Sequence, residues 1–143
     1  MTLYFKIEGK PTPKQSTRFT GFRAFTPKKI KEYAEKVRHS FLMNNYYWSY
    51  QSIIENPVKV KINVFVSIPK KFNKKLKQSA LEQKIRPVLR PDVDNIAKGI
   101  LDPLNGLVWA DDRQVCFLSI EKHYAESDYI TVEINEVQND RIY

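Results

Sequence analysis

The stretch Arg90-Pro-Asp-Val-Asp-Asn-Ile-Ala-Lys-Gly-Ile-Leu-Asp102 is the most informative part of the chain, and Pro-Leu-Asn-Gly-Leu-Val-Trp-Ala-Asp111-Asp112-Arg-Gln114 follows it directly. From Asn95 onward, apolar residues recur at helical spacing. This pattern predicts a helix whose buried face holds Ile96, Ile100, Leu101 and Leu104. Proline at position 103 lacks a backbone donor and disfavours the α conformation of the residue before it, so we expect the helix to end or kink at Asp102.

Five carboxylates fall within 21 residues of this stretch, and their spacing is regular. Asp92 and Asp94 alternate just after a proline, so an extended backbone would point both side chains to one side. Asp94, Lys98 and Asp102 are four residues apart and share one helical face. Oxygen ligands that converge from a loop, a helix start and a strand end suit a hard divalent cation such as Mg²⁺, and a nearby lysine suits phosphate chemistry.

Each of these residues also has a purely structural interpretation. An aspartate before a helix is usually an N-cap, and Asp94 with Lys98 could be a routine helical ion pair. Asp111-Asp112-Arg113 could be a plain turn. The sequence leaves these alternatives open for each residue taken singly, whereas the complete set in a basic chain favours a functional site.

Three segments together resemble the signature of the RusA-type Holliday junction resolvases. They are Pro91-Asp-Val-Asp-Asn-Ile-Ala-Lys98, Asp102-Pro-Leu-Asn-Gly106 and Asp111-Asp112-Arg-Gln114. The resemblance is strong over residues 86–115, and a weaker one covers Gly9-Lys-Pro-Thr-Pro-Lys14 and Phe25-Thr-Pro-Lys-Lys29. It implies a small, homodimeric, Mg²⁺-dependent endonuclease, with Mn²⁺ as a possible substitute, that cuts four-way DNA junctions. Such enzymes are often encoded by prophages and act on DNA in the bacterial cytoplasm, at the nucleoid.

The resemblance also implies roles for individual residues. Asp92, Asp94 and Asp112 would be the essential metal-binding carboxylates, with Asp111 as an accessory acidic group and Lys98 as the essential lysine. Asn95, Asp102 and Gln114 match motif positions without a firm role. Because the family usually has Asp-Ala-Leu where this chain has Asp102-Pro-Leu, the role of Asp102 stays open.

The net charge of +8 is distributed unevenly, with +15 on residues 1–90 and −7 on residues 91–143. A basic body around a small acidic centre suits an enzyme that binds phosphates and cuts them with a metal. The alternative is charge that serves only solubility. The cations expected to bind DNA are Lys14, Arg18, Arg23, Lys28, Lys29, Lys70, Lys71, Lys74, Lys75 and Lys77.

The pattern of the whole chain of 143 residues predicts one α/β (α+β) domain over residues 1–143, with a mixed sheet and helices packed against it. Strands are expected at 2–7, 58–68, 114–124 and 129–137, the last two as an antiparallel pair, and a small hairpin at 19–25. Helices are expected from the N-cap Thr26 to about residue 43, from the lysine-rich segment to about Lys84, and from Asn95. Segment 44–57 could be an insertion, a helix extension or a dimer surface.

Two further expectations concern location. No stretch approaches the roughly 20 apolar residues of a membrane span, and the first residues have the pattern of a strand and not of a signal peptide. The single cysteine, Cys116, lies in an apolar run, so we expect it to be buried in a protein of the reducing cytoplasm.

The sequence therefore predicts a metal-dependent endodeoxyribonuclease that resolves four-way DNA junctions as a homodimer. Two alternatives stay open. One is a metal-dependent nuclease for other branched DNA, such as flaps. The other is a non-catalytic basic DNA-binding protein whose carboxylates are caps and ion pairs.

Overall fold

The computed structural model describes residues 1–13, 18–20, 23–25 and 27–139. Its main feature is a four-stranded sheet in the order β1 (Thr2–Glu8), β6 (Tyr129–Glu136), β4 (Val58–Ser67) and β5 (Val115–Ala125). β4 runs parallel to β5, while the other neighbours are antiparallel. The predicted mixed sheet with helices against it is therefore confirmed.

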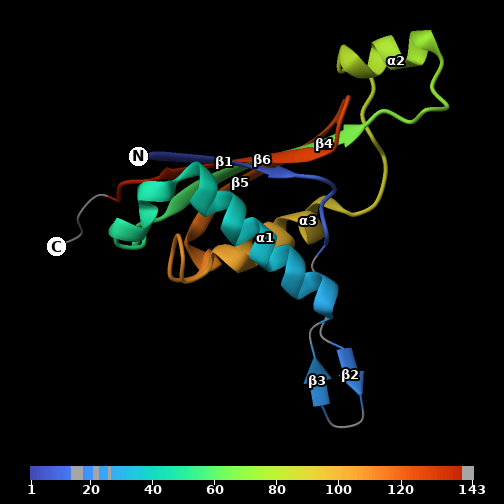
Figure 1. The fold of residues 1–143 in the computed structure, drawn as a ribbon. Coiled ribbons are helices and arrows are strands. Elements are labelled where there is room, and N and C mark those ends of the chain that lie inside the picture. Colours follow the sequence, from blue (N-terminus) through green and yellow to red (C-terminus); the bar gives the residue numbers. More distant parts are fainter. Residues whose placement is uncertain (14–17, 21–22, 26, 140–143) are drawn as a thin grey trace.

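Two helices cover one face of this sheet, and two smaller elements project from the body. Figure 1 shows α1 (Lys28–Asn44) and α3 (Val93–Leu101) on the same side of the sheet. The α2 helix (Lys74–Leu81) and the hairpin of β2 (Arg18–Thr20) and β3 (Arg23–Phe25) project in opposite directions (Figure 1). No helix in the described part of the chain is long and apolar enough to cross a membrane.

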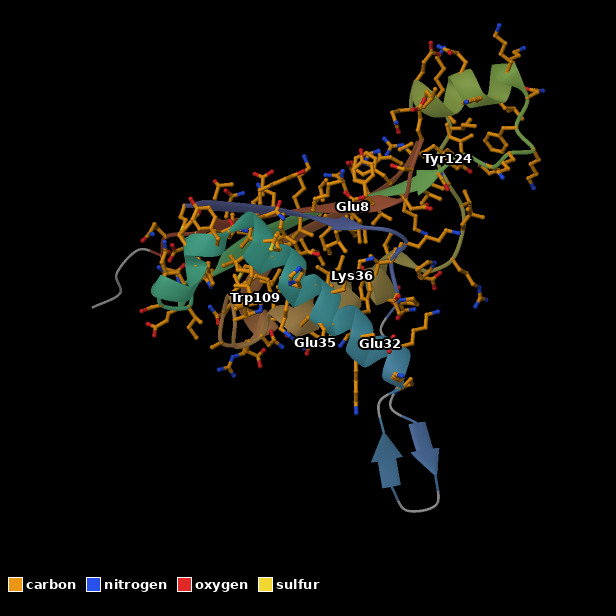
Figure 2. The ribbon with its side chains drawn as sticks, viewed as in Figure 1. Glu8, Glu32, Glu35, Lys36, Trp109 and Tyr124 are labelled. Carbon is orange, nitrogen blue, oxygen red and sulfur yellow. The ribbon has the colours of Figure 1, made fainter. Side chains whose placement is uncertain are left out.

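The core lies between the sheet and α1. Leu3, Phe5 and Ile7 alternate with exposed residues along β1, as period-two burial requires. β4 contributes Val58 to Val64 at every second position, and α1 contributes the stripe Ile30, Tyr33, Val37 and Phe41. Figure 2 labels Trp109, which is fully buried and belongs to the same apolar cluster.

The predicted pairing of the two C-terminal strands is wrong. β4 lies between β5 and β6 and forms hydrogen bonds with both. The connection from Ala125 to Tyr129 passes the end of β4, where the Asp128 carboxylate accepts hydrogen bonds from the backbone N–H of Ser67 (2.9 Å) and from its hydroxyl (3.2 Å). The short connection was consistent with a hairpin, but it is long enough to cross one strand.

Segment 44–57 stabilises the loop that precedes Asp111. It contains a short 3₁₀ turn, η1 (Tyr46–Tyr50), whose Trp48 is buried edge-on against Phe41. The indole N–H of Trp48 donates to the carbonyl of Leu107 (2.7 Å), and Ile54 N–H donates to the carbonyl of Val108 (2.8 Å). The segment is therefore part of the core packing and not an extension of α1.

Three smaller expectations differ from the structure or fall outside it. α2 is shorter than predicted because Asn73 caps its start and Gln83 adopts φ 61° after its end. Cys116 is exposed, since β5 is an edge strand whose register shifts at that position. Thr26, the predicted N-cap, lies outside the described residues, and α1 begins at Lys28.

Candidate active site

The start of α3 holds the first pair of candidate carboxylates. The helix begins at Val93, two residues earlier than predicted, so Asp92 is the N-cap residue and Asp94 lies in the first turn. Asp92 makes no side-chain capping hydrogen bond. Both carboxylates are exposed. Asp92 therefore occupies the N-cap position without capping the helix by its side chain, and its carboxylate faces solvent at the positive end of the helix dipole.

Lys98 lies one turn further along α3 and is also exposed. Among the described residues it forms no ion pair within 4.0 Å, and none joins Asp94 either. The routine helical ion pair of Asp94 with Lys98 is thus not formed. Lys98 lines a cavity of about 170 Å³ between α1 and α3, together with Arg38, Asp102 and others.

A second acidic group lies at the other end of α3. As predicted, the helix ends before Pro103, and a 3₁₀ turn, η2 (Asp102–Leu104), continues it. Burial raises the pKa of the Asp112 carboxyl above its ordinary value, and its hydrogen bond to Asp102 and the charges of Asp102 and Asp111 raise it further. Asp102 is therefore a neighbour of Asp112, a role that the sequence left open.

Gln114 fixes the position of the Asp111-Asp112 pair. Its side-chain carbonyl accepts from the backbone N–H of Ala110 (2.9 Å) and Asp111 (3.2 Å). Its amide group donates to the carbonyls of Ile54 (2.8 Å) and Asn56 (3.1 Å). The turn η3 (Asp112–Gln114) is thus tied to segment 44–57 by one side chain.

Asp111 has a structural role of its own. Its carboxylate accepts from the backbone N–H of Arg113 (2.9 Å), and with Gln114 it forms a capping box at the start of η3. The structural interpretation therefore holds for Asp111. The pattern Asp-x-x-Gln is a recognisable capping-box signature, and it could have identified Gln114 from the sequence alone.

The four predicted metal ligands are not assembled into one group. Within the described ranges, no three His, Cys, Asp or Glu side chains form a cluster that could hold a metal ion. Asp102, the neighbour of Asp112, lies eight positions after Asp94, which corresponds to a helical rise of about 12 Å. The chemistry of the donors nevertheless fits a hard divalent cation, because they are all carboxylates and the crowding around Asp112 would be relieved by a positive charge.

The predicted DNA-binding residues lie in two parts of the molecule. The lysines of the projecting segment are exposed, and none of them forms an ion pair with a described residue: Lys70, Lys71, Lys74, Lys75 and Lys77. At the start of α1, Lys29 is exposed and Lys28 lies 3.7 Å from Glu32. Arg18 belongs to β2 of the hairpin and Arg23 to β3. The structure describes the backbone of these two residues but not their side chains, and Lys14 lies outside the described residues.

Comparison with known proteins identifies the family of the chain. The model of the family Endodeoxyribonuclease RusA matches residues 8–135, so the chain belongs to this family of DNA-cutting enzymes. A relative from Bacillus subtilis (strain 168), "Uncharacterized protein YqaN", is 40% identical over 89 residues. The match covers 61% of this chain and 63% of that protein, so the chain spans less than two thirds of its relative's length.

Proposed function

We propose that the protein is a divalent-metal-dependent endodeoxyribonuclease that resolves four-way DNA junctions. Membership of the RusA family supports the class of reaction. The observation that supports this site most strongly is the combination of Asp92, Asp94 and Lys98 on one short helix, none of them paired with a described residue. Side chains that have no structural partner on a rigid helix are available to a substrate and a cation.

Asp92, Asp94 and Asp112 would hold the cation, with Asp111 as an accessory group. Mg²⁺ is the expected ion and Mn²⁺ its substitute, since both accept an all-carboxylate set. When bound, such an ion polarises the scissile phosphate and lowers the pKa of an attacking water. The raised pKa of Asp112 means that this carboxyl holds a proton more tightly than an isolated aspartic acid when no cation is present.

Lys98 would act on the phosphate itself. Its ammonium group is not neutralised by Asp94, so its full charge is available to the phosphate oxygens, where negative charge develops as the bond breaks. The exposed lysines of segment 70–77 would bind phosphates of the junction arms without reading bases. A homodimer, as the family resemblance implies, would present two such sites to the two-fold symmetry of a junction.

The decisive experiment incubates the pure protein with a labelled four-way junction, a flap and a plain duplex, each with and without Mg²⁺. We expect metal-dependent cleavage of the junction in preference to the other two. Asp92→Asn, Asp94→Asn and Asp112→Asn should bind the junction but not cut it, because each removes a charged ligand and almost no volume. Metal-independent cutting, or normal cutting by all three variants, would contradict the proposed site.

A further inference from the structure

A cavity of about 150 Å³ opens beside the start of α3, and no step described above uses it. Two elements form an apolar wall of this cavity. β4 contributes Val64 and Val66, and α3 contributes Ile96. Val64 and Ile96 are fully or almost fully buried, so this wall is a rigid part of the core. A cavity of about this volume with an apolar lining has room for one aromatic ring.

The rim of this cavity is strongly cationic. Lys10, Arg90 and Lys122 all line it, and none of them is ion-paired with an acidic residue of the described chain. Asp128 is the acidic residue on the rim, and its two oxygens already accept hydrogen bonds from Ser67. Lys122 Nζ donates to the carbonyl of Leu89 (2.5 Å), which holds the ammonium group at the edge of the opening.

The cavity is continuous with the surface around Asp92. An adjoining groove is lined by Asp92 and Val93, and it shares Leu89, Arg90 and Lys122 with the cavity. A ligand that places a ring in the cavity therefore extends past the cationic rim toward the candidate carboxylates. An aromatic ring joined to phosphate is the chemistry of a nucleotide.

We propose that this cavity binds one unstacked nucleobase of the DNA strand, while Lys10, Arg90 and Lys122 hold the phosphates on either side of it. The proposal rests on the proposed function, since it takes DNA as the substrate. Extrusion of a base is easiest where pairing or stacking is already weakened, as at the centre of a branched DNA. A base held here would fix which phosphodiester bond lies beside Asp92 and Asp94.

The experiment places 2-aminopurine, a base analogue whose fluorescence rises on unstacking, at each position next to the branch of a four-way junction. Binding is measured without divalent metal, so that no cleavage occurs. We expect the fluorescence to rise at one position when the wild-type protein binds. Val66→Phe fills the cavity and should remove this rise while the Kd for the junction stays within about threefold of wild type.

Two further variants make the result specific. Arg90→Ala removes an exposed cation from the rim without touching the apolar wall, so it should reduce the rise even if Val66→Phe folds poorly. Met43→Phe adds a ring to the exposed end of α1, outside the cavity lining, and should leave the rise unchanged.

The outcomes separate this site from the proposed activity. Tight junction binding with no fluorescence change at any position, or an undiminished rise in both Val66→Phe and Arg90→Ala, would overturn the base-binding site. Metal-dependent junction cleavage in the same preparation would show that the nuclease proposal survives that result. A free deoxynucleoside monophosphate that binds the protein while the junction gives no rise would identify a small-molecule site and overturn the assignment to DNA.

Discussion

At the scale of single residues, Lys98 gives the clearest distinction between a structural and a chemical role. Because it has no ion pair with a described residue, Lys98→Ala should change the free energy of unfolding by no more than about 0.5 kcal/mol. Loss of its charge from the transition state should slow cleavage by about a hundred- to thousandfold, or roughly 3–4 kcal/mol. Single-turnover rates at saturating enzyme measure this effect. A rate within about threefold of wild type would show that Lys98 is only a surface residue.

Gln114 is expected to act by positioning other groups. Gln114→Ala removes four hydrogen bonds that join Asp111 to segment 44–57, so we expect it to lower the free energy of unfolding by about 2 kcal/mol. The rate of cleavage should also fall, because the turn that positions Asp112 is no longer held by these hydrogen bonds. Urea unfolding of Gln78→Ala is the control, since that amide only contacts Glu82 on the exposed surface of α2. Equal stability of the two variants would contradict this role.

His123 should make stability depend on pH. Arg86 Nη1 lies 2.8 Å from its Nδ1, and because a guanidinium only donates, that nitrogen must accept and the ring is neutral. Burial lowers the pKa of His123 below its ordinary value, and the nearby charge of Arg86 and the weaker one of Lys61 lower it further, against an opposing effect of Glu121. In the unfolded chain the histidine therefore binds a proton near pH 6.5, whereas in the folded chain it does so only at a lower pH.

The sign of the pH effect follows from this difference. Stability should be level above about pH 6.5 and fall as the pH decreases toward the lowered pKa, by at most about 1.4 kcal/mol per pH unit. Urea unfolding at about pH 7.5 and about pH 5.5 measures the loss, and His123→Gln should lose less than wild type. Identical losses would show that other groups set the acid sensitivity.

At the scale of elements, the projecting segment around α2 is expected to bind DNA phosphates through the charges of its lysines alone. Replacing Lys70, Lys71 and Lys74 with alanine should weaken junction binding and shallow the plot of log K against log salt by about 0.9 for each phosphate that is no longer bound. Lys84→Ala is the matched control on the same segment, because Glu82 already compensates that charge at 3.0 Å. If the triple substitution does not change the salt slope, these lysines bind no phosphates and are only solvated surface residues.

The sequence alone predicted some of the helices and strands correctly, but not the pairing of every strand. Periodicity predicted β1, β4 and α1 well, because each has an unbroken alternation or stripe that a single buried face imposes. The partner of β5 could not be read in the same way. Strand pairing depends on contacts between distant segments, and the hydrogen bonds of β4 with both β5 and β6 show that the last connection crosses β4.

The candidate site shows the same division between local and distant information. The spacing of Asp92, Asp94 and Lys98 follows from local sequence, and the structure places Asp94 and Lys98 on α3 and Asp92 at its N-cap position. The proximity of Asp112 to Asp102 depends on how the loop before η3 folds back, which segment 44–57 decides through Trp48 and Ile54. A sequence pattern cannot reveal that proximity.

For the molecule as a whole, the edge strand β5 is the surface that a second copy of the chain is expected to cover. Four consecutive residues, Cys116 to Ser119, are exposed there, and none is charged. Phe117 and Leu118 are 53% and 47% exposed. An uncovered, uncharged edge with large apolar side chains favours association, and proteins that stay monomeric usually protect such an edge with charge.

We therefore expect light scattering at working concentration to give twice the mass of one chain, and Phe117→Lys to give the mass of a single chain, because a lysine at a strand edge opposes pairing. Tyr46→Lys is the control, since Tyr46 is 81% exposed and belongs to η1 and not to β5. A two-fold dimer at this edge puts Asp112 of each copy five residues from the centre of β5 pairing at Phe117, so the two sites would lie no more than about 35 Å apart. If both variants dimerise equally, β5 is not the interface. If the wild-type protein is monomeric, there is no interface at β5 and the paired cuts of a junction must be made by separate molecules.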